Sequence, residues 1–292
     1  MRITNGMQLN DALASEARTS QQLYDLTTEA SSGYRVNTPS DDPAAYASIV
    51  SIDSRISILQ ARSTAATAAT SDLSTAEGVL SSASSLLVQA KQIAISMANG
   101  TVDPATRANA ATSVAGLSQQ LLSMANTEGS SGYLFGGTAT GTQPFDATGN
   151  FVGNAGTTQI EVAEGVNVQT NVSGALAFTA AGGSDIFADL KALSTALSSN
   201  DVAGITAAIS TMGADNNQVI AAQASAGTMI DQLQSSSTVI SSAVTNAQTQ
   251  LANTQDADVA QVYSEYEASQ TSYESALSVT KQILALPTVL QS

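Results

Sequence analysis

The sequence contains no cysteine, no histidine and no tryptophan. Without thiols the chain can form neither disulfides nor cysteine-ligated zinc sites. Without imidazole it can build neither a Ser-His-Asp triad nor a histidine metal site. These absences remove the commonest catalytic and metal-binding chemistries. We therefore expect a protein that is not an enzyme, with no catalytic residue, no metal ligand and no cofactor.

Positive charge is also scarce. The chain has 9 Lys+Arg against 24 Asp+Glu, a formal net charge of −15, whereas nucleic-acid binding needs clustered cations. No apolar run approaches the roughly 18 residues that cross a bilayer. The N-terminus lacks the continuous apolar stretch of a cleavable secretory signal. We expect no nucleic-acid partner, no membrane insertion, and export without a cleaved Sec signal.

Aromatic residues make up 4% of the chain and charged residues 11%. Much of the 43% hydrophobic content is alanine, which buries little area per residue. A chain of this kind builds thin cores, and thin cores suit long helices that pack closely side by side.

Two long heptad patterns predict two long helices. The first starts at Pro43, after the capping residues Asp41 and Asp42, and continues to Asn99-Gly100. The second runs from Val202 to Leu251. Its seam contains three polar residues, which can fix the register of a coiled coil: Asn216, Gln223 and Ser237.

Shorter elements lie between the long helices. Asp103-Pro104 repeats the cap-plus-proline start of a helix, and a further helix is predicted over about 184–199. Residues 158–162 and 166–172 alternate apolar and polar around Glu164-Gly165, which predicts a β-hairpin. The sequence therefore predicts a mainly α fold, a long antiparallel helical bundle or coiled coil with terminal helices and an inserted small β-rich domain.

The two ends of the chain carry apolar stripes too thin to bury themselves alone. The N-terminal stripe is Leu9, Leu13, Ala17, Ser20, Tyr24 and Thr27. The C-terminal stripe, with Asp256 as the expected cap, is Val259, Val262, Tyr266, Ser269, Tyr273, Ala276, Thr280 and Ile283. Such helices would cover each other or bind neighbouring copies. We take the following as candidate assembly residues: Leu9, Leu13, Tyr24, Val259, Val262, Tyr266, Tyr273 and Ile283.

Several short motifs occur along the chain in an order that is shared with a known protein family. The segment SSGYRVNTPSDDPAA (residues 31–45) is followed by ANGT (98–101), MANT (124–127), GYLFGGT (132–138), QPF (143–145) and DAD (256–258). These segments closely resemble the bacterial flagellin family. The prolines around Ser-Asp-Asp and the opening Met1-Arg-Ile-Thr4 are similar to the hook–filament junction branch of that family. The motif residues are Gly33, Arg35, Asn37, Pro39, Asp41, Asp42 and Pro43.

The resemblance implies a role and an organisation. Residues 1–35 and 255–292 would form an inner assembly domain of terminal helices, 36–128 and 185–254 the α-helical bundle, and 129–184 a β-rich outer insertion. The protein would be extracellular in the bacterial flagellum. It would join hook-associated protein 1 to flagellin, assemble with copies of itself, and use a flagellar export chaperone. We expect Arg35 to pair with Asp41 or Asp42.

Three alternatives remain open at this point. Within the family, the chain could be a short flagellin that polymerises into the filament itself. Outside it, an acidic coiled-coil signalling rod has a similar composition. A secreted surface-binding protein could use the aromatic residues of the β-segment, which are Tyr133, Phe135, Phe145 and Phe151.

Overall fold

The computed structural model describes residues 5–285. The motif at Met1–Thr4, and residues 286–292 of the predicted terminal domain, lie outside the described residues. The chain divides into two compact units, one containing residues 1–58 and 244–292 and the other residues 59–243. Both boundaries fall inside long helices, so the predicted three-domain division stays a prediction. In residues 5–285 no helix has the length and apolar content needed to span a membrane.

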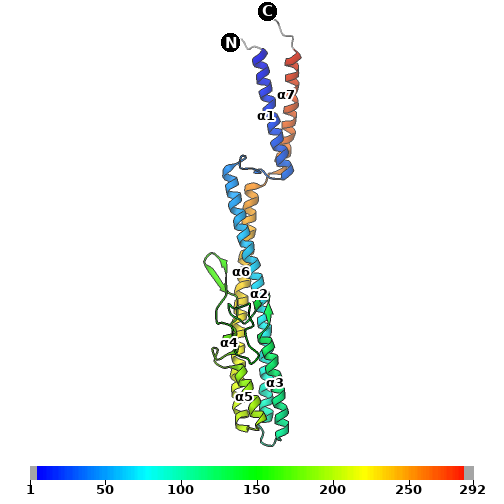
Figure 1. The fold of residues 1–292 in the computed structure, drawn as a ribbon. Helices are drawn as coiled ribbons and strands as arrows, with labels where there is room; N and C mark the ends of the chain where they lie inside the picture. Colours follow the sequence, from blue (N-terminus) through cyan, green and yellow to red (C-terminus); the bar gives the residue numbers. More distant parts are fainter. Residues whose placement is uncertain (1–4, 286–292) are drawn as a thin grey trace, which may run out of the picture. The chain divides into compact units, whose positions relative to one another are not determined.

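The first unit contains two antiparallel helix pairs. Helices α1 (Asn5–Ser32) and α7 (Val259–Ala285) lie side by side (Figure 1). The second pair consists of the start of α2 (Pro43–Met97) and the end of α6 (Val202–Gln255). In this pair Ile52, Ile56 and Ala247 form a buried cluster against which Leu251 packs.

The two predicted heptad seams are confirmed. On α6 the buried residues recur every seventh position, as a coiled coil requires: Ile205, Met212, Val219, Ala226, Leu233, Ile240 and Ala247. On α2 the same holds for Ile52, Leu59, Ala66, Leu73, Leu80 and Leu87. Inside the second unit the Ser84 hydroxyl donates to Asn216 Oδ1 at 2.6 Å. A polar pair at seam positions disfavours other registers, because a shift would leave both groups without a partner.

The second unit also contains α3 (Pro104–Ala125), which packs against α5 (Ile186–Ser198). The predicted start of α3 is confirmed, since Asp103 Oδ1 accepts the backbone N–H groups of Ala105 and Thr106 at 2.9 Å each. Arg107, on the first turn of α3, is 2% exposed.

The segment between α3 and α5 is less regular than predicted. The expected hairpin is present as β3 (Gln159–Ala163) and β4 (Val166–Gln169), which pair antiparallel with an irregularity between Glu161 and Ala163. A two-residue pair, β1 (Glu128–Gly129) and β2 (Gly132–Tyr133), and a short helix, α4 (Gly174–Phe178), were not predicted. Loops make up most of the rest. Arg62 on α2 holds the hairpin through a 2.8 Å ion pair with Glu161.

A phenylalanine cluster forms the core of this irregular segment. The chain has five phenylalanines, and each of their rings contacts at least one of the others. Phe145 lies at the centre, with ring centroids 5.2 Å from Phe151, 5.2 Å from Phe187 and 5.8 Å from Phe178. Phe135 and Phe145 are completely buried. Of the four aromatic residues that a surface-binding protein would use, Phe135 and Phe145 are therefore part of the core and are not free to bind a ligand.

Candidate assembly site

The motif of residues 33–43 forms a joint in the first unit, between α1 and α2. Gly33 ends α1 with φ +76, a left-handed conformation that glycine adopts without strain, and its N–H donates to Glu29 O at 2.8 Å. The chain then runs antiparallel beside the link from α6 to α7. Ala257 N–H donates to Gly33 O at 2.9 Å, and Arg35 N–H donates to Gln255 O at 2.8 Å. The joint therefore ties together segments from opposite ends of the sequence.

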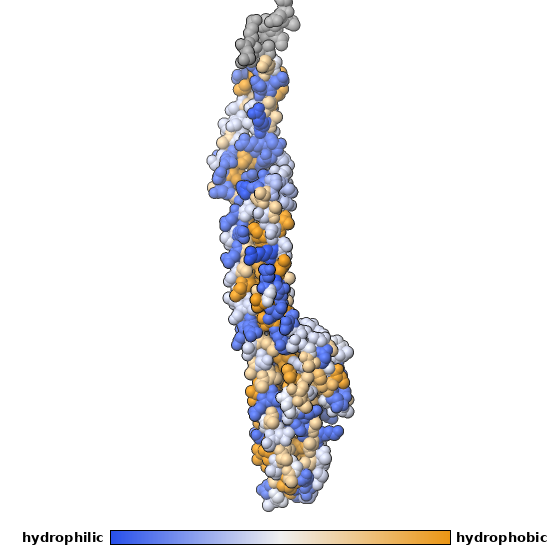
Figure 2. All heavy atoms as spheres, turned by 90° about the vertical axis from the view of Figure 1, so that its left-hand side faces the viewer, coloured by the Kyte–Doolittle hydropathy of each residue, from blue (hydrophilic) through white to orange (hydrophobic). Residues whose placement is uncertain are grey.

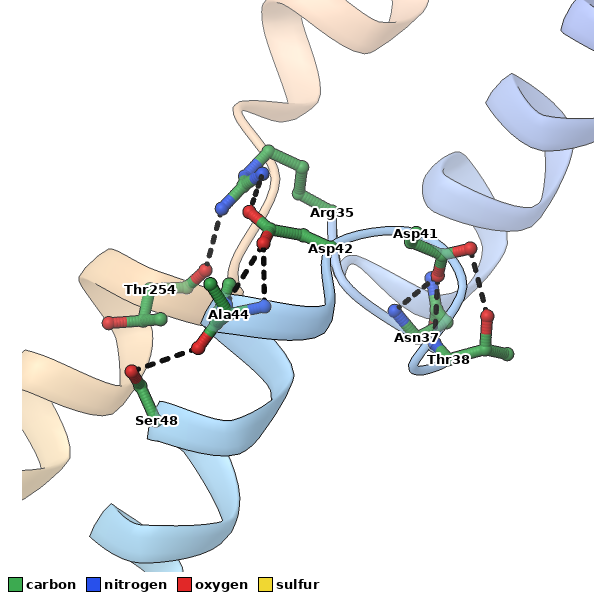
Figure 3. Close-up of polar contacts among 9 residues, drawn as sticks. Arg35, Asn37, Thr38, Asp41, Asp42, Ala44, Ser48 and Thr254 are labelled. Atoms are coloured by element: carbon green, nitrogen blue, oxygen red, sulfur yellow. Dashed lines mark hydrogen bonds and ion pairs between the residues drawn. The ribbon is translucent and has the colours of Figure 1, made fainter.

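Arg35 extends this connection with its side chain (Figure 3). Its Nη2 donates to the carbonyl oxygen of Thr254 at 3.0 Å, in the last turn of α6, where a cation also meets the negative end of the helix dipole. Its Nη1 lies 3.7 Å from Asp42 Oδ2. Of the two expected carboxylate partners, the structure pairs Arg35 with Asp42. Because the side chains are 50% and 37% exposed, this ion pair contributes about 0–1 kcal/mol to stability.

The two adjacent aspartates have different tasks. Asp42 caps α2, since its Oδ1 accepts the N–H groups of Ala44 and Ala45 at 3.1 and 3.0 Å, and Pro43 is the first helical residue. Asp41 instead closes the preceding turn. It accepts from the N–H groups of Thr38 and Asn37 at 2.7 and 2.9 Å and from the Thr38 hydroxyl at 2.9 Å (Figure 3). These bonds, those of Thr38 first, lower the pKa of Asp41.

Two other motif residues complete the turn. Asn37 Nδ2 donates to Tyr34 O at 2.8 Å, and Pro39 lies in the exposed part of the turn. Val36, at 1% exposed, is the buried apolar residue of this motif. Sequence reasoning missed Val36, and its only signal was an apolar residue inside an otherwise polar segment.

The α7 stripe matches the prediction apart from its first residue. Val262, Ser269 and Thr280 are buried, and Tyr266, Tyr273, Ala276 and Ile283 are half-buried. Val259 is 53% exposed. The predicted cap is two residues early, because Asp258 rather than Asp256 accepts the N–H groups of Ala260 and Gln261. Asp256 instead forms a β-bridge with Tyr34.

The α1 stripe differs from the prediction. Leu9 is half-buried, but Leu13 is 47% exposed and Tyr24 is 68% exposed. The covered face is Leu9, Ala12, Glu16, Thr19, Leu23 and Leu26. The predicted stripe and the covered face both follow the alternating three- and four-residue spacing of a heptad. The covered face includes Leu23 and Leu26, which the predicted stripe does not. Of the two uses expected for the N-terminal stripe, the structure does not show it pairing with α7, and contact with neighbouring copies stays a prediction.

The helix pair consequently leaves large apolar side chains exposed. They are Met7, Leu13 and Tyr24 on α1, and Val259, Tyr263, Val279 and Leu284 on α7. Elsewhere, on the face that Figure 2 draws, hydrophobic residues form short patches broken by hydrophilic ones. An exposed apolar set on a pair of helices is typical of a surface that another chain covers.

Charge near the joint is predominantly negative. The pKa of Glu29 is raised, first by partial burial and then by Glu265, while Arg35 acts in the opposite direction. Within residues 5–285 no group of three or more acidic side chains is arranged to hold a metal ion. The joint connects α1, α2, α6 and α7 through backbone pairing, helix caps and one arginine.

Comparison with known proteins shows which family has a similar sequence. Residues 3–140 match the family model described as the bacterial flagellin N-terminal helical region. Within these residues the chain is similar to the flagellin family. The resemblance read from the sequence motifs is thereby confirmed.

Among curated proteins, the chain is similar to a flagellar hook-associated protein. Flagellar hook-associated protein 3 of Salmonella typhimurium is 33% identical over 155 residues, which are 52% of this chain and 49% of that protein. The chain thus spans about half the length of the curated relatives it matches.

Solved structures share the fold. A Vibrio parahaemolyticus protein described as a putative flagellar hook-associated protein aligns with 74% of this chain and 100% of its own, with TM-score 0.68 and 21% identity. The flagellar junction protein FlgL of Legionella pneumophila aligns with 71% of this chain and 99% of its own, with TM-score 0.56 and 17% identity. At these identities the likeness concerns the fold alone, and the predicted mainly helical fold is confirmed.

Proposed function

We propose that this chain is a non-catalytic structural subunit of the bacterial flagellum that joins the hook to the filament. Its partners would be hook-associated protein 1 on one side, flagellin on the other, and neighbouring copies of itself, with an export chaperone before assembly. It would act outside the cell after export without a cleaved Sec signal. The names of the relative and of the solved structures support this role, as do Pro39 and Pro43 in the joint motif.

The observation that carries the proposal is the exposed apolar set on α1 and α7. The pair covers only one face of each helix, and Tyr24 and Tyr263 remain 68% and 59% exposed. Burying a large apolar side chain completely contributes about 1.5–3 kcal/mol. Several such residues covered together by neighbouring copies would offset the entropy lost on association. We therefore assign the contacts between subunits to the faces that point away from the α1–α7 seam.

A matched set of variants tests this assignment. Tyr24→Ser combined with Tyr263→Ser should leave the thermal unfolding of the monomer nearly unchanged, because both side chains are exposed. The same variant should bind poorly to isolated hooks carrying hook-associated protein 1, measured by co-sedimentation. Val166→Ser, which removes an apolar side chain that is 51% exposed in the hairpin, is the control and should bind like the wild type.

Two results would contradict the assignment. One is binding of the double tyrosine variant at wild-type strength. The other is an equal loss in the Val166 control, which would place the contact outside the terminal helices.

The match to a flagellin N-terminal region also favours a second candidate, a short flagellin that forms the filament itself. This candidate predicts that the purified chain alone grows long filaments, which a junction subunit does not.

A further inference from the structure

Helix α6 carries a carboxylic acid in an unusual place within the second unit. Asp215 is 0% exposed, and neither of its carboxyl oxygens has a hydrogen-bond partner of good geometry, although the side chains of Ser184 and Asp189 lie near it. A buried charge without a partner is costly, so buried carboxylates are normally paired. The heptad seam does not require an acid here, and nothing in the proposed assembly uses one.

The groups that face Asp215 are mostly acidic. From α5 these are Asp185, whose Oδ1 caps that helix by accepting the N–H of Ala188 at 3.1 Å, and Asp189 in the first turn. On the α2 side the neighbouring charge is Lys91, which lines a surface groove with Gly213 and Asn216. Among the residues described, no cation lies within ion-pair distance of Asp215.

The lysine of α5 forms no ion pair with Asp215 among the described residues. Lys191 lines a surface groove between α5 and α6, together with Asp189, Asp201 and Thr211. Ionisation of Asp215 would therefore bring a negative charge beside Asp185 and Asp189 with no ion-paired cation of its own among the described residues.

One turn further along α6, Gln218 fastens the loop that ends the irregular segment. Its Nε2 donates to Thr179 O and Ser184 O at 3.1 Å each, and its Oε1 accepts the N–H of Ser184 at 2.8 Å. The loop is closely packed, because a Cβ added to Gly182 would lie 2.0 Å from Leu176 O. The contact that Gln218 makes and the acid cluster around Asp215 thus meet at the same loop, residues 179–185.

We propose that Asp215 is a proton-dependent lock that controls how firmly residues 179–185 and the start of α5 are held on α6. With its proton, Asp215 is neutral and the loop stays closed over it. Without the proton, the carboxylate repels Asp185 and Asp189 and draws water into the contact, and the loop loosens. The fold thereby couples the attachment of the irregular segment to the pH outside the protein.

Burial, and then the charges of Asp189 and Asp185, raise the pKa of Asp215 to about 7, while Ser184 acts in the opposite direction. In the unfolded chain an aspartate titrates at about 3.9. Between these values the native state binds one more proton than the unfolded state, so stability falls as pH rises. The unfolding equilibrium constant should grow by up to tenfold per pH unit from about pH 4 to pH 7, and this contribution should level off above pH 7.

Thermal unfolding of the full chain from pH 4 to 9 tests the proposal with matched variants. Asp215→Asn keeps the shape of the side chain and removes its titration, so its melting temperature should fall less than that of the wild type between pH 4 and 7. Asp231→Asn changes an exposed aspartate of the same helix and should keep the wild-type slope. Parallel profiles for the wild type and Asp215→Asn would overturn the proposal.

Two further measurements separate the lock from a general effect on stability. Hydrogen exchange of residues 177–189, corrected for intrinsic rates, should accelerate above pH 7 in the wild type and not in Asp215→Asn. Carboxyl NMR of ¹³C-aspartate in the wild type needs no variant and should show one resonance with a midpoint above pH 6. Midpoints below pH 5 for every aspartate, or exchange that responds equally in both chains, would contradict the lock.

Discussion

Arg107 is a buried arginine with three side-chain hydrogen bonds, and the structure predicts a large stabilising contribution from it. It is 2% exposed and has no carboxylate partner among the described residues. Its Nε donates to Met97 O at 3.0 Å and its Nη2 to Asn99 O at 2.7 Å, so the guanidinium caps the end of α2. Its Nη1 donates to Asn200 Oδ1, and Asn200 is held in the left-handed region at φ 58. This one side chain therefore holds two turns in place, the turn between α2 and α3 and the turn between α5 and α6.

The expected cost follows from these three bonds. Each contributes about 1 kcal/mol net, and methionine in place of Arg107 retains the apolar stem. Arg107→Met should thus lower the free energy of unfolding by about 3 kcal/mol, which corresponds to a melting temperature lower by about 5–10 °C. Arg107→Lys restores one donor and should lie between the two. Urea unfolding followed by circular dichroism measures all three chains.

The exposed Arg55 of α2 provides the control for the loss of a cation. Arg55→Met should change the free energy of unfolding by less than about 0.5 kcal/mol. If Arg107→Met cost no more than Arg55→Met, the buried guanidinium would not stabilise the turns, and the reasoning would be refuted.

Three other predictions concern the joint and the phenylalanine cluster. Gly33→Ala should destabilise the chain by about 1 kcal/mol, because alanine adopts a positive φ only with strain, and Gly33→Asn should destabilise it by less. Equal urea midpoints for both variants would contradict this. Because the pKa of Asp41 is lowered in the folded chain, its contribution to stability is present above about pH 4 and is lost as pH falls further. Asp41→Asn should therefore show a smaller change of melting temperature between pH 2 and 5 than the wild type. Parallel melting-temperature profiles would exclude this contribution. Phe145→Ala should cost about 3–5 kcal/mol in urea unfolding, clearly more than Phe151→Ala, whose ring is at the edge of the cluster; the reverse order would be inconsistent with the packing described.

The long helices were predictable because their signals are local and repeat many times. The seam of α6 shows this, with buried residues from Ile205 to Ala247 at constant intervals. The Asp103-Pro104 start of α3 is equally local, since the cap and the groups it accepts lie within three residues. Patterns of this kind need no knowledge of the tertiary structure.

The joint and the register of α1 could not be predicted in the same way. Arg35 and Thr254 are 219 residues apart, and no sequence pattern indicates that a backbone carbonyl will lie beside a given guanidinium. On α1 two stripes share the same spacing, and only the partner helix decides that Leu26 is buried while Tyr24 is exposed. The resemblance to a known family identified the joint motif, but the different tasks of Asp41 and Asp42 became clear only from the structure.

The role of the chain at the junction is tested most directly by electron microscopy of the purified full-length protein. It should be imaged alone, with isolated hooks carrying hook-associated protein 1, and with those hooks plus flagellin. The account predicts no long filaments from the chain alone, binding at hook ends, and flagellin filaments that start only where the chain is bound. Long filaments formed by the chain alone, or hook ends that stay bare, would contradict it.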